Sequence, residues 1–239
     1  DTLFEGALPT DICGESSTHY TKLPDYPLTL ERMSQRLTDV KLIYVMRHPV
    51  DRLISHYIHQ WSQNVIKCDI NEAIDTFEEL TAYSCYARQL APYFKQYGKG
   101  NVLPVFTEAI RRNPQAELER VAQFIGYKDD VVWQDDLSAQ NVSGERIRPF
   151  KGYAWLVESR LMTFLRRRLV PQCLRDRVKK SLTMKKRPEI DAVHLSRLTE
   201  LFNQDLAVLG EQLGIKLSCD NYKDLVMSGS LNWQNAGDD

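Results

Sequence analysis

The chain has 239 residues, of which 43% are hydrophobic, enough for one sizeable domain with a buried core. Its formal net charge of −1 gives no overall field that would attract nucleic acid. No apolar run approaches the roughly 18 residues of a membrane-spanning helix. The charge is uneven, however. Residues 144–188 carry 14 basic and 3 acidic side chains, which makes this block a candidate surface for an anionic ligand.

The five cysteines are scattered, and no two of them have the spacing of zinc ligands. An odd number of cysteines favours free thiols in a reducing compartment, so the cytoplasm is the expected location. Because the chain starts at Asp1 without a methionine, an N-terminal anchor could have been removed, and the Golgi lumen stays open as the alternative. No pair of carboxylates suited to Mg²⁺ is apparent, and the sequence predicts no bound metal.

The first part of the chain is expected to be irregular to about residue 12. Residues 14–20 (GESSTHY) predict a polar turn, followed by a loop that contains Pro24 and Pro27. Leu30, Met33 and Leu37 share one side of a short helix predicted over residues 29–37.

A strand, a sharp turn and a helix follow within residues 41–62. Residues 42–46 (LIYVM) are apolar and predict a buried strand of a parallel sheet. Pro49 occupies a position that the first turn of a helix tolerates. Five apolar residues then recur at helical spacing and form one face: Leu53, Ile54, Tyr57, Ile58 and Trp61.

The turn between this strand and this helix carries residues that suit an anion. Ligands bind at the carboxyl ends of strands in open α/β sheets, and helix N-termini attract anions. Arg47 offers a planar fork of donors that matches phosphate oxygens, and Ser55 offers a hydroxyl within the first two helical turns. The alternative interpretation is a solvated helix beside an arginine that caps the edge of the sheet.

The next segments alternate between helix and strand. Residues 71–80 and 83–97 have helical periodicity, and the second of them carries an aromatic stripe that we expect in the core. Residues 101–106 (NVLPVF) predict a second strand. Pro104 indicates an edge strand or a strand end, because proline cannot donate a hydrogen bond to a neighbour.

Two further helices carry clear start and stop signals. Asn113 and Pro114 predict an N-cap and first helical residue, and Gly126 predicts the stop. Residues 191–214 have apolar positions three and four apart and end at a glycine. No internal repeat or linker divides the chain. We therefore expect one domain over residues 1–227 and a disordered tail over residues 228–239.

The turn after the first strand has the spacing Arg47-x-Pro49-x-x-Arg52-x-x-Ser55-x-Tyr57. This spacing resembles the 3′-phosphate-binding signature of sulfotransferases that use 3′-phosphoadenosine 5′-phosphosulfate (PAPS). The variant with Ser-His-Tyr is most similar to the heparan-type and bacterial branch of that family. The resemblance implies that Arg47 and Ser55 hold the 3′-phosphate of the nucleotide.

The polar turn at residues 14–20 resembles the Gly-Glu-x-Ser-Pro-x-Tyr segment of the same branch. Two positions depart from it, since Ser16 stands where heparan-type enzymes usually have lysine and Thr18 where they have proline. Glu15 is a candidate general base, with a structural role at a strand end as the alternative. His19 is a second candidate, with a packed core histidine as the alternative.

Two later segments also resemble parts of these enzymes that approach the nucleotide. Ser84-x-Tyr86-x-x-x-Leu90 is similar to the segment after the signature helix, which implies a nucleotide-binding role for Tyr86. Lys151-Gly152 is similar to a late loop that closes over the nucleotide, where an ammonium and a backbone amide can meet a phosphate.

The resemblance implies an α/β fold of the P-loop NTPase-like sulfotransferase type, in which helices flank a central parallel sheet. PAPS enzymes carry a Gly-rich segment near their start that grips the 5′-phosphosulfate. Nothing before Gly14 matches that segment. We therefore expect the N-terminal part of the fold to be missing from this chain.

The sequence thus predicts transfer of a sulfuryl group from PAPS to a hydroxyl or amine acceptor, with release of 3′,5′-ADP. The expected partners are this nucleotide and an unidentified acceptor, which could be a small molecule, a lipid or a glycan. Two alternatives stay open: a non-catalytic module that binds nucleotide or polyanion, and a kinase-like phosphotransferase of related fold. The second alternative should show GxxxxGK[ST] and metal-holding acids, and neither is apparent.

Overall fold

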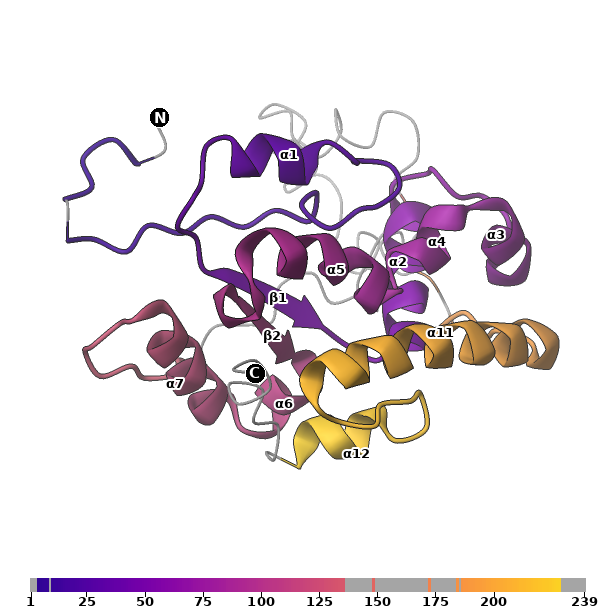
Figure 1. Cartoon of the computed structure of the whole chain (residues 1–239). Helices are drawn as coiled ribbons and strands as arrows, with labels where there is room; N and C mark the ends of the chain where they lie inside the picture. The colour runs from indigo at the N-terminus through magenta and orange to yellow at the C-terminus, as the bar shows by residue number, and fades with distance from the viewer. Residues whose placement is uncertain are drawn as a thin grey trace.

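The computed structural model describes residues 4–8, 10–135, 148, 172, 184 and 186–228. Their elements, in chain order, are α1 (Thr29–Ser34), β1 (Leu42–Met46), α2 (Pro49–Ser62), α3 (Ile70–Thr76), α4 (Glu78–Ala82), α5 (Tyr86–Tyr97), the 3₁₀ helix η2 (Lys99–Asn101), β2 (Val102–Phe106), α6 (Thr107–Arg112), α7 (Pro114–Ile125), α11 (Ala192–Leu213) and α12 (Tyr222–Met227) (Figure 1).

The two strands pair in parallel, with Leu42 opposite Val102 and Met46 opposite Phe106. The chain crosses from β1 to β2 through the helices α2 to α5, as a parallel connection requires. Pro104 lies in the middle of β2, and its carbonyl oxygen accepts a hydrogen bond from Nη2 of Arg120 on α7 at 3.0 Å. Among the described strands β2 pairs with β1 alone, as an edge strand does. The parallel sheet between helices confirms the predicted α/β class.

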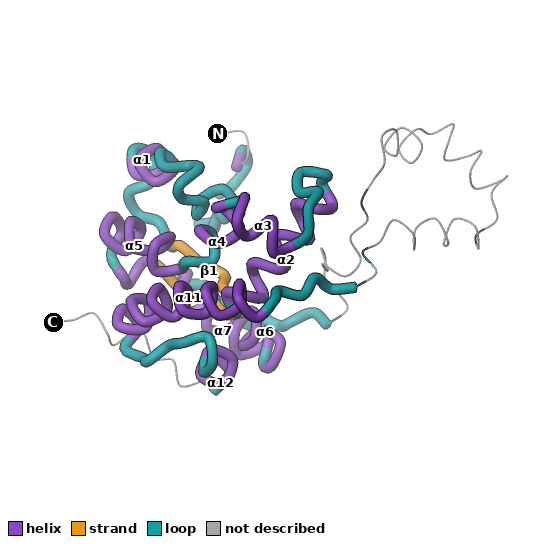
Figure 2. Tube along the Cα trace, turned by 90° about the vertical axis from the view of Figure 1, so that its right-hand side faces the viewer, coloured by secondary structure: helices purple, strands orange, loops and turns teal. Residues whose placement is uncertain are grey.

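Helices pack around this short sheet (Figures 1 and 2). α11 packs across α5 and also contacts α2, while α6 and α7 contact β2. All five residues of β2 are buried, because helices cover it. The buried residues from α2, α5, β2, α11 and α12 form a single apolar cluster, which holds the end of β1 and the start of α2 in place.

Local signals explain three of these helices. Pro49 is the first residue of α2, as predicted. Asn113 Oδ1 accepts a hydrogen bond from the N–H of Ala116 at the start of α7, and Gly126 ends that helix in the left-handed conformation at φ 77°. The long helix α11 begins after Asp191, whose carboxylate accepts a hydrogen bond from the N–H of His194.

The predicted helices over residues 71–80 and 83–97 differ from the structure. The first is divided at Phe77, whose backbone is extended, and becomes α3 and α4. The second begins only at Tyr86, after a turn at Tyr83 and Ser84 and an N-cap at Cys85. The carboxylate of Asp205 on α11 accepts hydrogen bonds from the N–H groups of Ala87 and Arg88, at 2.9 and 3.0 Å. This distant cap stabilises a helix start that local periodicity does not reveal.

Several predicted features lie outside the described residues: Lys151, Gly152, most of the basic block at residues 144–188 and the tail beyond Ser228. The division into one domain over residues 1–227 and a tail stays a prediction.

Candidate functional site

The site begins at the carboxyl end of β1, where the strand passes into α2 (Figure 1). Arg47 is the first residue after β1. Its carbonyl oxygen accepts a hydrogen bond from the hydroxyl of Tyr86 at 2.6 Å, and its N–H donates to the same hydroxyl at 3.4 Å. The structure therefore brings together two of the residues that the sequence singled out, Arg47 and Tyr86.

The side chain of Arg47 is half-buried. Its Nε atom is buried and has no hydrogen-bond partner among the described residues. A buried N–H without a partner costs free energy, and a guanidinium satisfies that N–H best with an anionic oxygen. Arg47 is therefore suited to bind an anion at the strand tip.

Ser55 lies on α2 and is half-buried. Within the described residues its hydroxyl forms no hydrogen bond, so it keeps its capacity to donate one to a ligand. Ser55 and Arg47 are the two groups near the start of α2 that we expect to hold a phosphate.

The carboxylate closest to this site in sequence is already neutralised. Asp51, in the first turn of α2, forms ion pairs with Arg187 at 2.6 Å and Lys223 at 3.0 Å. Burial raises the pKa of Asp51, but Lys223, Arg187 and Arg47 together hold that pKa below its usual value. Asp51 therefore has other cations to pair with, and Arg47 is not needed to neutralise it.

The arginine at the third position of the motif is packed differently from Arg47. The guanidinium of Arg52 lies over the ring of Tyr83, 5.4 Å from its centroid, and Nη1 is 3.5 Å from Nδ1 of His56. Burial, with the charges of Arg52 and Lys22, lowers the pKa of His56 to about 3, so His56 is neutral at pH 7. Arg52 is thus engaged with aromatic rings, which identifies Arg47 as the better phosphate ligand of the two.

The two candidate bases lie in an irregular, exposed segment. Glu15 is exposed, and no strand precedes it among the described residues. His19 is exposed too, with Nδ1 3.3 Å from the hydroxyl of Ser17 and its ring edge-on to Tyr26 at 5.0 Å. Neither has a contact with Arg47 or Ser55 in the described structure. Their catalytic roles stay predictions, as do those of Lys151 and Gly152.

Sequence reasoning missed two acidic residues that shape the site. Glu108, which follows β2, accepts a hydrogen bond from the N–H of His48 at 2.9 Å. Asp205 caps the first turn of α5, next to Tyr86. The position of Glu108, two residues after the end of the second strand, was a usable signal, because the ends of parallel strands meet at one edge of a sheet. Asp205 had no such local signal.

Neither a metal centre nor a membrane-spanning helix is found within the described residues. No group of three or more histidine, cysteine or acidic side chains is placed to hold a metal ion there. In the same part of the chain, no helix combines the length and apolar character that crossing a bilayer requires.

Comparison with known families agrees with this geometry. The family model described as "Sulfotransferase domain" matches residues 20–206. That range includes the strand tip, both phosphate-binding candidates and most of α11.

Curated relatives are similar over about half of the chain. Heparan sulfate glucosamine 3-O-sulfotransferase 3B1 of Mus musculus is 33% identical over 137 residues, which are 52% of this chain and 35% of that protein. The 3A1 enzyme of Mus musculus is 33% identical over 119 residues, 45% of this chain and 30% of that protein. The chain thus spans about a third of the length of these relatives.

A solved structure shares the fold. The crystal structure of a sulfotransferase from Alicyclobacillus acidocaldarius superimposes with a TM-score of 0.62 at 21% sequence identity. The similarity covers 90% of this chain and 70% of that chain.

Proposed function

The chain belongs to the sulfotransferase domain family, and from this premise we propose that it transfers a sulfuryl group from PAPS to a hydroxyl or amine acceptor. The proposal rests mainly on the state of the Arg47 guanidinium. Its buried Nε has no hydrogen-bond partner within the described residues, although it lies at the strand end where α/β proteins bind ligands. The 3′-phosphate of PAPS supplies the missing acceptor.

Arg47 and Ser55 anchor the nucleotide in this proposal. Arg47 offers charge-assisted hydrogen bonds, which contribute about 1.5–3 kcal/mol each, and Ser55 donates its hydroxyl to the same phosphate. Lys151 and Gly152, which lie outside the described residues, close over the nucleotide. PAPS is a co-substrate, and no metal is required.

The transfer step needs in-line positioning and a base. The acceptor oxygen or nitrogen forms a bond to sulfur while the bond between sulfur and the bridging phosphate oxygen breaks, which releases 3′,5′-ADP. The proton of the acceptor passes to a base. Glu15 is our first candidate for that base, and His19 is the second. Nearby cations neutralise the charge that spreads over the transferred group.

The names of the curated relatives suggest which acceptors to test first. Those proteins act on a glucosamine unit of heparan sulfate. We propose a sugar hydroxyl as the first acceptor to examine for this chain, before lipid and small-alcohol acceptors. The cytoplasm stays the expected location, with the Golgi lumen as the alternative.

Binding to immobilised 3′,5′-ADP tests the nucleotide site. We expect the wild-type protein to be retained and to elute with free 3′,5′-ADP. Arg47→Ala should weaken binding by about tenfold or more, because one or more charge-assisted hydrogen bonds are lost. Arg32→Ala, at an exposed position on α1, is the matched control and should bind like the wild type. An Arg47→Ala variant that binds as tightly as the wild type would overturn the proposal.

A further inference from the structure

The backbone of Arg47 is held by hydrogen bonds, whereas the Nε of its side chain has no hydrogen-bond partner among the described residues. The hydroxyl of Tyr86 donates to the Arg47 carbonyl at 2.6 Å and lies 3.4 Å from the Arg47 N–H, which donates to it. One hydroxyl therefore meets both backbone polar groups of the same residue. This arrangement fixes the orientation of Arg47 at the end of β1.

The next backbone group is also held. The N–H of His48 donates to Oε1 of Glu108 at 2.9 Å, and Oε2 of Glu108 accepts a hydrogen bond from the hydroxyl of Thr107 at 3.0 Å. The peptide group between Arg47 and His48 thus has its carbonyl bound from α5 and its N–H bound from α6. α5 and α6, which lie outside the motif, therefore fix the backbone position from which the Arg47 side chain extends.

Tyr86 is itself firmly placed. Its side chain is 1% exposed, and its ring packs edge-on against Tyr44 with centroids 6.0 Å apart. Asp205 accepts hydrogen bonds from the two N–H groups that follow Tyr86 in the first turn of α5, those of Ala87 and Arg88. The hydroxyl of Tyr86 therefore has little freedom to leave the Arg47 backbone.

We propose that Tyr86 is a positioning residue, which aims the Arg47 guanidinium at the 3′-phosphate by fixing the Arg47 backbone. The proposal rests on the proposed function and assigns Tyr86 an indirect role. Since its hydroxyl already donates to Arg47 and is buried, Tyr86 acts on the nucleotide through Arg47 and not by direct contact. An arginine whose backbone is already fixed loses less conformational freedom when its guanidinium binds a phosphate.

The affinity ratio between 3′,5′-ADP and 5′-AMP isolates this effect, because the two nucleotides differ only in the 3′-phosphate. Isothermal titration calorimetry gives the dissociation constants of 3′,5′-ADP and 5′-AMP. Tyr86→Phe keeps the ring against Tyr44 and removes only the hydroxyl. We expect the preference for 3′,5′-ADP to fall by about fivefold, the effect of about one hydrogen bond. The affinity for 5′-AMP should stay unchanged.

Tyr57→Phe is the matched control. The hydroxyl of Tyr57 also donates to a backbone carbonyl, that of Cys68 at 2.8 Å, and its side chain is 5% exposed. It has no hydrogen bond with Arg47 in the described structure. Loss of this hydroxyl should lower thermal stability to a similar degree as Tyr86→Phe and leave the nucleotide preference unchanged.

The outcomes separate this inference from the proposed function. A wild-type protein that binds both nucleotides equally would overturn the proposed function and this inference with it. If the preference disappears in Arg47→Ala but persists fully in Tyr86→Phe, only the positioning role is wrong. An equal fall in both Tyr→Phe variants would mean a general loss of structure and would also overturn it. Should Tyr86→Phe not fold, Asp205→Asn, which weakens the cap beside Tyr86, must lower the preference.

Discussion

At the scale of single residues, Gly210 occupies a position in α11 that has no room for a Cβ atom. It lies in the last turns of α11, just before the chain folds back at Gly214. A Cβ on Gly210 would overlap the carbonyl oxygen of Ile215 and lie 3.0 Å from the backbone nitrogen of Leu217. Both obstacles are backbone atoms, which cannot move aside as a flexible side chain can.

Gly210→Ala should therefore destabilise the protein. At an open helical position the same change gains up to about 1 kcal/mol, because alanine is the better helix former. At Gly210 we expect the free energy of unfolding to fall by about 1–3 kcal/mol, the usual cost of overpacking. Urea denaturation measures it. Gln204→Ala, exposed on the same helix, should stay within about 0.5 kcal/mol of the wild type. A Gly210→Ala variant of unchanged or higher stability contradicts the close approach.

The sequence singled out Arg47, Ser55 and Tyr86, but it did not reveal the contacts that fix the backbone around Arg47. Arg47 and Ser55 belong to one local motif, and the resemblance of that motif to a phosphate-binding signature led us to expect a phosphate site there. The hydroxyl of Tyr86 reaches Arg47 from 39 residues away, and Glu108 reaches His48 from 60 residues away. Nothing in a single sequence gives the direction of those side chains, because packing of α5 and α6 determines it.

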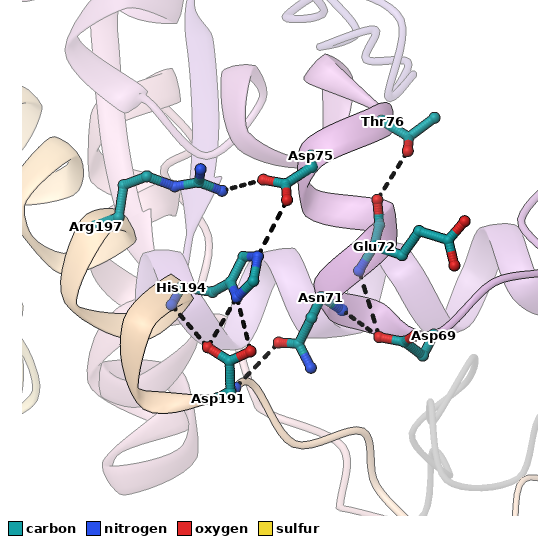
Figure 3. Close-up of polar contacts among 8 residues, drawn as sticks. All are labelled: Asp69, Asn71, Glu72, Asp75, Thr76, Asp191, His194 and Arg197. Atoms are coloured by element: carbon teal, nitrogen blue, oxygen red, sulfur yellow. Dashed lines mark hydrogen bonds and ion pairs between the residues drawn. The ribbon is translucent and has the colours of Figure 1, made fainter.

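At the scale of elements, a polar network joins the start of α11 to α3 (Figure 3). His194 Nδ1 is 2.8 Å from both carboxylate oxygens of Asp191, and its Nε2 is 3.2 Å from Asp75 on α3. Arg197 forms an ion pair with the other oxygen of Asp75. The backbone N–H of Asp191 donates to Asn71 at 3.0 Å. Together these contacts hold α3 against the N-terminal turns of α11.

This network predicts a pH-dependent contribution to stability. Hydrogen bonds from His194 to Asp191 and Asp75 raise the pKa of His194 above its usual value. A raised histidine pKa stabilises the folded state fully below the unfolded pKa of about 6.5, and the effect is lost as pH rises through the folded pKa. The difference in unfolding free energy between wild type and His194→Ala should therefore be largest below about pH 6.5 and shrink in alkaline solution.

Scanning calorimetry over a pH series measures this difference. Val193→Ala is the matched control, since Val193 is exposed, adjacent and carries no titratable group. It should follow the pH dependence of the wild type. A stability difference between wild type and His194→Ala that is the same at every pH would show that His194 contributes by packing alone.

Elements with local caps were predictable, and those with distant caps were not. α2 and α7 begin at Pro49 and Pro114, as their proline and N-cap signals indicated, and α11 begins at Ala192, one residue after the start that its apolar periodicity predicted. The break before α5 was missed. Aromatic periodicity continues through residues 83–86, while the carboxylate that stabilises the new helix start belongs to Asp205, 118 residues further along the chain.

At the scale of the whole molecule, the strand tip, α5 and α11 share one apolar core. Phe202 and Leu206 of α11 are fully buried, and Leu90 of α5 is 1% exposed. The strand and helix patterns, together with the resemblance of the motif at Arg47, were enough to predict the α/β class. It was not enough to predict that α11, near the end of the chain, would pack beside the site, because only tertiary contacts place it there.

In the proposed site, Arg47 and Ser55 bind one phosphate together. A double-mutant cycle of Arg47→Ala and Ser55→Ala, with 3′,5′-ADP affinity measured by calorimetry, tests it most directly. Residues that share a binding partner couple by about 0.5–3 kcal/mol. We expect coupling in this range, so that the double variant binds little more weakly than Arg47→Ala alone. Effects that simply add, with no coupling, would contradict it.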